Sequence, residues 1–252
     1  MLEQVQDAFS QRVEGVLELL EFDNLVIDHL VGGLDGIATD LEERKHNTAA
    51  QAVRNRLQAL KNIRSAQSLR HAYGTIYNQC VVLLVSYFDA AMGDLFRVAV
   101  ADGLRRGCDL PAAQRQVELS WRVLNESSTG PEGLFAQRIL DLDDISFQDM
   151  KSIRRAFSKN IGVDLGRDET ANDIILGQAV RHLLAHAGGI VDEKFRGQVS
   201  GAFPRTLKQQ PPEDGTIQFQ PEEIRILAEA MKRFVDHGVA CCRAKWPVQQ
   251  PT

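Results

Sequence analysis

The stretch that decides the fold is YGTIYNQCVVLLVSYFDAAMGDLFRVAV, residues 73–100. Its apolar residues recur at the i, i+3, i+4, i+7 spacing that places side chains on one face of an α-helix. The members of this stripe are Tyr77, Cys80, Val81, Leu84, Val85, Phe88, Met92, Leu95 and Ala99. The spacing therefore predicts a long helix at the centre of a helical bundle.

Helical spacing also occurs on both sides of this stretch. Gly32-Gly33 interrupts the first pattern, which predicts one or two amphipathic helices that end there. Gly188-Gly189 suits the C-terminal end of a later helix, and Pro221, followed by two glutamates, is a favourable start for the last one. Further helices are expected at residues 2–31, 48–69, 112–124, 132–140, 146–158, 171–187 and 222–243.

The composition agrees with a helical protein. Apolar residues make up 44% of the chain but aromatic residues only 6%, and Ala, Leu, Val, Gln and Arg recur with little Pro or Gly. Residues 197–220 lose the periodicity, which indicates a long loop or a short hairpin. We therefore predict an all-α protein whose length suits one compact domain or several units. The units would be a helical extension at 1–70, acidic then basic, a core bundle at 71–196, a loop at 197–221 and a C-terminal helix at 222–246 that packs on the core.

Charge is distributed unevenly along the chain. The net charge of −5 argues against a protein that coats nucleic acid through bulk charge. Residues 1–43 hold eleven acidic residues against one basic residue, Arg12, whereas residues 44–88 hold seven Lys or Arg and no acid. Two solvated helix faces that partly neutralise each other explain this pattern, and a local phosphate-binding surface is the alternative.

The N-terminal segment lacks the pattern of a secretory signal. Glu3, Asp7 and Glu14 occur where such a signal has a basic and then an apolar run. The longest apolar run, Cys80 to Val85, is far too short to span a membrane. We expect a soluble, cytoplasmic protein with no membrane partner.

The predicted helix at 171–187 has an apolar and a polar face. On a wheel of about 100° per residue with Val180 at zero, His182 and His186 lie roughly 200° and 240° round, and Arg181 lies on the flank near 100°. The core face comprises Leu176, Val180, Leu183, Leu184 and Ala187. The polar side also carries Gln178, Ala185 and Gly189. A guanidinium and two imidazoles on such a surface suit phosphate chemistry, because Arg offers paired donors to phosphate oxygens and His exchanges protons near neutral pH.

The segment AVRHLLAHAGGIVDEKF, residues 179–195, resembles the active-site signature of the HEPN ribonuclease superfamily. In that family an Arg, a following polar residue and a His a few positions later precede a small or Gly-containing turn. The matching residues here are Arg181, His182 and His186. The run Tyr87-Phe88-Asp89 also resembles the early HEPN helix that bears an aromatic and an acidic residue. The resemblance extends over roughly residues 70–195.

This resemblance implies a HEPN-like helical bundle with additional N- and C-terminal helices. It further implies a homodimer in which the two motif helices face each other, and a metal-independent endoribonuclease without a cofactor. Arg181 and His186 would be catalytic at a composite dimer site on RNA, and His182 would support them, although many family members have Asn at its position. Bacterial HEPN domains occur in defence and toxin systems, which implies a protein partner or an antitoxin. The alternative is a non-catalytic module that binds RNA, a nucleotide or a protein.

Other residues suggest further sites. Arg154, Arg155 and Lys159 form a basic group that would help to hold RNA or would be a solvated face. His182 and His186 are spaced i, i+4 as in zinc-binding helices, but Leu183 stands where an HExxH motif has Glu. The four cysteines, without CxxC spacing, are Cys80, Cys108, Cys241 and Cys242. We expect buried, reduced thiols and no metal site.

Overall fold

The computed structural model describes residues 1–65, 70–126, 129–210 and 215–246. Within these ranges the chain forms helices and no strand beyond one isolated antiparallel bridge between Ile190 and Thr216, so the protein is all-α as predicted. None of the described helices is long and apolar enough to cross a membrane. The elements are α1 (Leu2–Glu43), α2 (Asn47–Ser65), α3 (Arg70–Arg105), the 3₁₀-helix η2 (Pro111–Gln114), α4 (Trp121–Glu126), α5 (Gly130–Leu142), α6 (Met150–Ala156), the π-helical turn η3 (Phe157–Ile161), α7 (Glu169–Ala187), α8 (Glu193–Val199) and α9 (Pro221–Lys245).

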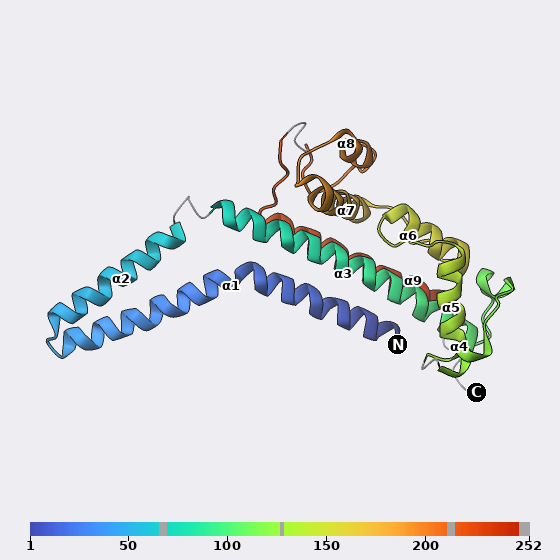
Figure 1. Ribbon diagram of the computed structural model, residues 1–252, viewed down its shortest axis with the longest axis horizontal. Helices are drawn as coiled ribbons and strands as arrows, with labels where there is room; N and C mark the ends of the chain where they lie inside the picture. The colour runs from blue at the N-terminus through green and yellow to red at the C-terminus, as the bar shows by residue number, and fades with distance from the viewer. Residues whose placement is uncertain (66–69, 127–128, 211–214, 247–252) are drawn as a thin grey trace.

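The central helix is α3, as the spacing at residues 73–100 predicts. Helices α1, α5, α7 and α9 all pack against it, and Figure 1 shows α1 on one side of α3 and α7 on the other. The predicted stripe is buried except at Tyr77, which is half-buried. Phe88 illustrates the packing, because its ring lies edge-on to Phe9 of α1 at 6.3 Å and to Phe234 of α9 at 5.9 Å between centroids.

The prediction that the first helix ends at Gly32-Gly33 is wrong. Helix α1 continues through both glycines to Glu43, and α2 packs back along its second half as one arm of a helical hairpin (Figure 1). A glycine costs a helix only about 1 kcal/mol relative to alanine, which tertiary contacts readily offset. Arg54 of α2 supplies such contacts by pairing with Glu42 at 2.6 Å and Asp35 at 3.3 Å. Residues 66–69, the end of the predicted second helix, lie outside the described residues.

Two of the shorter predicted helices have different bounds. The helix expected at 112–124 is broken, because residues 115–120 are not helical between η2 and α4. Arg115 adopts an extended backbone and its guanidinium lies 2.8 Å from Asp143 beyond α5, a tertiary contact that the local pattern does not reveal. The helix expected at 146–158 starts only at Met150, because the side chain of Asp149 caps it by accepting from the Ser152 backbone N–H at 2.8 Å.

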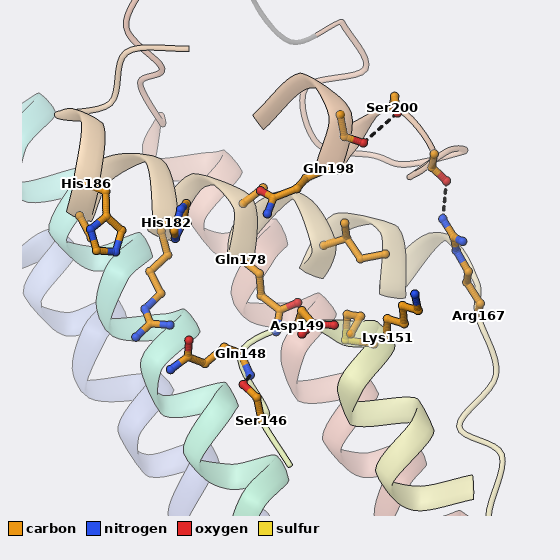
Figure 2. Close-up of a pocket in the computed structure, with 17 residues that line it drawn as sticks. Ser146, Gln148, Asp149, Lys151, Arg167, Gln178, His182, His186, Gln198 and Ser200 are labelled. Atoms are coloured by element: carbon orange, nitrogen blue, oxygen red, sulfur yellow. Dashed lines mark hydrogen bonds between the residues drawn. The ribbon is translucent and has the colours of Figure 1, made fainter. Parts of the chain in front are cut away.

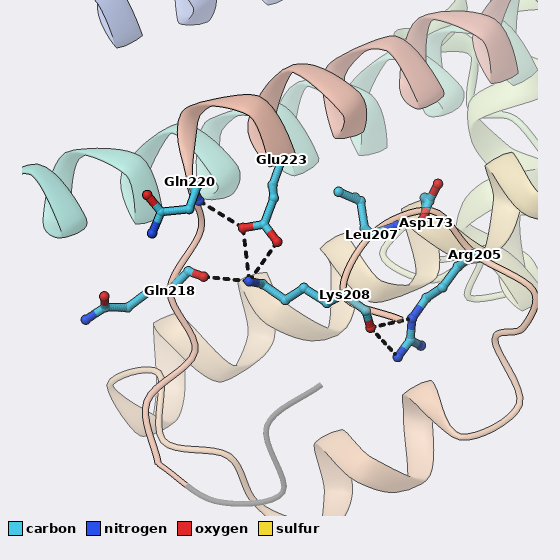
Figure 3. A network of polar contacts seen from close by, with 7 residues as sticks. All are labelled: Asp173, Arg205, Leu207, Lys208, Gln218, Gln220 and Glu223. Carbon is cyan, nitrogen blue, oxygen red and sulfur yellow. Dashed lines mark hydrogen bonds and ion pairs between the residues drawn. The ribbon is translucent and has the colours of Figure 1, made fainter. Parts of the chain in front are cut away.

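The described part of the predicted loop before α9 is held in place by polar contacts (Figure 3). Helix α8 extends to Val199, and residues 211–214 lie outside the described residues. The buried Arg205 donates to the carbonyl oxygen of Lys208 at 3.0 Å, and the Lys208 ammonium contacts Glu223 at 3.0 Å. The carboxylate of Asp173 on α7 accepts from the Leu207 backbone N–H at 2.7 Å. These contacts hold the loop against α7 and the start of α9.

Helix α7 lies between the core and the outer surface. Its buried face packs on α3 and α9, and at Gly177 the helices approach so closely that a Cβ atom would lie 2.9 Å from Cδ1 of Leu227. The helix ends as predicted at Gly188, which has the left-handed φ of 59°, and Gly189 follows with φ 83°. The C-terminal half of α7 thereby exposes its polar face beside α8.

Candidate functional site

The three motif residues on α7 line one cavity of about 800 Å³. Helix α7 forms its floor, and α8 and the start of α6 form its sides (Figure 2). His182 and His186 are exposed and Arg181 is half-buried, so the prediction that the histidines lie outside the core is confirmed. Gln178 and Gly189 were expected on the same polar side, but both are buried.

The two histidines form a pair at one end of the cavity. Their ring centroids are 4.6 Å apart, and the Lys194 ammonium lies 2.9 Å from Nε2 of His182. Desolvation lowers the pKa of His182, and the charges of Lys194, His186 and Arg181 lower it further against the opposing effect of Asp192. A neutral His182 that accepts from Lys194 carries its proton on Nδ1. The lowered pKa and the contact with Lys194 therefore favour a neutral imidazole at His182, beside the ring of His186.

Arg181 is held from beneath by Asp89 of α3. Its Nη1 donates to Oδ2 of Asp89 at 3.1 Å, and Nε2 of Gln178 donates to the other carboxylate oxygen at 3.1 Å. The Asp89 side chain is only 11% exposed, whereas that of Arg181 is 31% exposed. A guanidinium has five N–H donors, so this contact leaves donors that face the cavity. The buried carboxylate thus orients Arg181 and leaves it able to bind an anion.

Burial raises the pKa of Asp89 to about 6, against the lowering effects of the Gln178 hydrogen bond and the Arg181 charge. Because the folded pKa lies above the unfolded value of 3.8, the folded protein binds the extra proton between these pH values and loses stability as pH rises from about 4 to about 6. We expect this pH-dependent loss, on the order of 2–3 kcal/mol, to be absent in Asp89→Asn. Urea denaturation of both proteins at pH 4.5 and pH 7 measures it. Equal pH dependence in the two proteins would contradict this assignment.

The cavity is also lined by residues that the sequence patterns did not single out. Lys151 comes from α6, Arg167 from the segment before α7, and Gln198 from α8. Figure 2 shows Lys151 and Arg167 at the opposite end from the histidines. These residues come from three separate segments, so no local spacing connects them. Asp149, the cap of α6, was likewise not expected to line a site.

The basic group predicted to bind RNA lies elsewhere. None of Arg154, Arg155 and Lys159 lines the large cavity. Lys159 lies 2.8 Å from Asp143, and Arg154 lies 3.7 Å from Asp164. Arg155 lines a smaller cavity of about 70 Å³ with Lys159. The structure therefore does not bring these three side chains together with Arg181.

Metal ligands are not grouped in the described part of the chain: no three His, Cys, Asp or Glu side chains lie close enough there to hold an ion. All four cysteines are free thiols. Cys80 and Cys242 are buried as predicted, but Cys108 and Cys241 are only half-buried. Burial raises the pKa of Cys242 to about 12, so this thiol stays protonated at neutral pH.

The arrangement combines an oriented cation with two accessible imidazoles in one cavity. Such a set is able to bind a phosphate, neutralise charge that develops on it and exchange a proton with its substituents. The helical wheel placed Arg181 and His186 roughly 140° apart, yet both side chains line this cavity within one chain.

Comparison of the chain with protein-family models, curated proteins and solved structures finds no match.

Proposed function

We propose that the protein is a metal-independent endoribonuclease of HEPN type whose catalytic residues are Arg181 and His186. The observation that carries the proposal is that both side chains line one cavity, where Asp89 orients the guanidinium. The resemblance of residues 179–195 to the HEPN signature supports it, as does the all-α fold around α3 and α7. His182 would support the reaction as a neutral hydrogen-bonding group.

In this proposal the nucleophile belongs to the substrate. His186 takes the proton from an RNA 2′-hydroxyl, or protonates the leaving 5′-oxygen, while the bond from the 2′-oxygen to phosphorus forms and the bond to the 5′-oxygen breaks. Arg181 stabilises the negative charge that develops on the phosphate oxygens. The products carry a 2′,3′-cyclic phosphate, or its 3′-phosphate hydrolysis product, and a 5′-hydroxyl.

The experiment is an incubation of the purified protein with mixed RNA, and separately with DNA, in the presence of EDTA. Because side chains supply both proton transfer and phosphate neutralisation, RNA should be cleaved with the chelator present. DNA should survive because it lacks the 2′-hydroxyl. Finding 5′-phosphate ends, or activity that disappears with chelator, would contradict the roles of Arg181 and His186.

One observation favours a second candidate function. In the described part of the chain no hydrogen bond orients the ring of His186, whereas a catalytic base is usually positioned by a third group. The second candidate is therefore a non-catalytic module that binds RNA through the same cavity. RNA that binds with Arg181-dependent affinity and stays intact would identify it.

We also propose a homodimer in which the exposed ends of two α7 helices face each other. Ala185 and His186 are exposed there, and the small Ala185 side chain allows a close approach. A two-fold axis near these residues would place two copies of the cavity side by side. Sedimentation velocity at micromolar concentration should show a dimer, and a monomer throughout that range would contradict a composite site.

A further inference from the structure

The cavity is longer than one phosphate requires. The residues of α7 that line it form a stripe along the helix, comprising Ile175, Gln178, Ala179, Arg181, His182, Ala185 and His186. At about 1.5 Å per residue this stripe extends for roughly 16 Å. Consecutive phosphates of a nucleic-acid strand lie much closer together than this, so a strand that fills the cavity brings more than one phosphate into it.

The end away from the histidines is cationic. Among the described residues no carboxylate forms an ion pair with Lys151 or Arg167, whereas Arg154 and Lys159 pair with Asp164 and Asp143. The Arg167 guanidinium is held by Oδ1 of Asn172 at 3.1 Å and by the carbonyl oxygen of Gly201, two neutral acceptors. No ion pair within the described residues therefore neutralises either charge, so both cations are available to bind an anionic ligand.

Asp149 is an acidic residue that lines the cavity, and its carboxylate already accepts two hydrogen bonds from Ser152. Asp149 accepts from the backbone N–H of Ser152 at 2.8 Å and from its hydroxyl at 2.7 Å, which fixes the carboxylate at the start of α6. Other polar side chains that line the cavity are neutral amides and hydroxyls, including Ser146, Gln148, Gln198 and Ser200. Amides and hydroxyls both donate and accept hydrogen bonds, as base edges and ribose require.

We infer that Lys151 and Arg167 form a second phosphate subsite, so that the substrate is a single-stranded RNA segment spanning at least two consecutive phosphates. This inference rests on the proposed function and specifies its substrate class. One phosphate lies between Arg181 and His186, and a flanking phosphate lies at Lys151. The cavity of about 800 Å³ has the size of a small-molecule site, which suits a few nucleotides of one strand. None of the described residues that line it is Phe, Tyr or Trp, so the amides and hydroxyls of the lining hold the bases by hydrogen bonds.

A binding experiment tests the subsite without relying on cleavage. The probe is a fluorescein-labelled oligouridylate with 2′-O-methyl groups, which cannot undergo attack by a 2′-hydroxyl, and its affinity is measured by anisotropy at several salt concentrations. Loss of one phosphate contact in Lys151→Gln should weaken binding roughly fivefold and reduce the salt slope by about 0.7. The matched control is Lys232→Gln, because Lys232 on α9 lies 3.9 Å from Glu14 of α1 and outside the cavity.

Cleavage assays then separate this inference from the proposed function. A dinucleoside monophosphate has only the scissile phosphate, so its KM should not respond to Lys151→Gln, whereas the KM of a tetranucleotide should rise roughly fivefold at unchanged kcat. Equal salt slopes for Lys151→Gln and Lys232→Gln would overturn the subsite and leave the proposed function standing. Lys151-dependent binding without any cleavage would keep the subsite and overturn the enzyme. An oligonucleotide that does not bind to the unmodified protein would overturn both.

Discussion

Replacing His186 by alanine is expected to lower the rate of RNA cleavage by roughly 10²–10⁴, the usual contribution of a general acid or base. The side chain is exposed and lines the cavity, so its loss removes the proton carrier without disturbing the core. Single-turnover cleavage of a fluorescent RNA oligonucleotide, with enzyme in excess, measures the chemical step directly.

The neighbouring histidine provides the matched control. His182→Ala should lower the rate less, because His182 accepts from Lys194 at 2.9 Å and is held neutral. Both variants should unfold at the temperature of the unmodified protein, since both side chains are exposed. A His186→Ala variant that retains more than about a tenth of the rate would show that the imidazole is not the acid or base of this reaction.

Replacing Phe88 by alanine is expected to lower the free energy of unfolding by roughly 3–5 kcal/mol, the usual cost of emptying a buried aromatic site. Its side chain is 0% exposed, and its edge-on contacts with Phe9 and Phe234 connect α3 to α1 and α9. Neighbouring helices are too constrained to close the resulting cavity completely. Urea denaturation followed by circular dichroism measures the change in the free energy of unfolding.

An exposed aromatic residue serves as the comparison. Trp121 is 76% exposed at the start of α4, so Trp121→Ala should change the free energy of unfolding by no more than about 0.5 kcal/mol. The slope of the free energy of unfolding against urea concentration should stay the same in both variants if the unfolded state is unaltered. A Phe88→Ala loss below about 1 kcal/mol would show that the centre of the core relaxes around the missing ring.

The apolar spacing of the sequence by itself determined the helical class and the two helices that matter most for the site. Residues 73–100 and 171–187 repeat apolar side chains at helical intervals, and the structure forms α3 and α7 there. The end of α7 at Gly188 was also predictable, because a left-handed residue is needed where the chain leaves the helix. The same wheel placed His182 and His186 on the solvent side. Each of these features depends on residues within a few turns of one another.

Only the tertiary structure decided which side chains from different helices meet. The pairing of Arg181 with Asp89 joins α7 to α3, and Lys151 and Arg167 reach the cavity from two further segments. Helix α1 likewise continues through Gly32-Gly33, and its second half packs against α2. Helical periodicity reports which face of a helix is apolar, but it contains no information on the rotation and offset at which two helices pack. That packing brought an Arg on the flank of one helix and two solvent-facing histidines on the same helix together at one end of a cationic cavity.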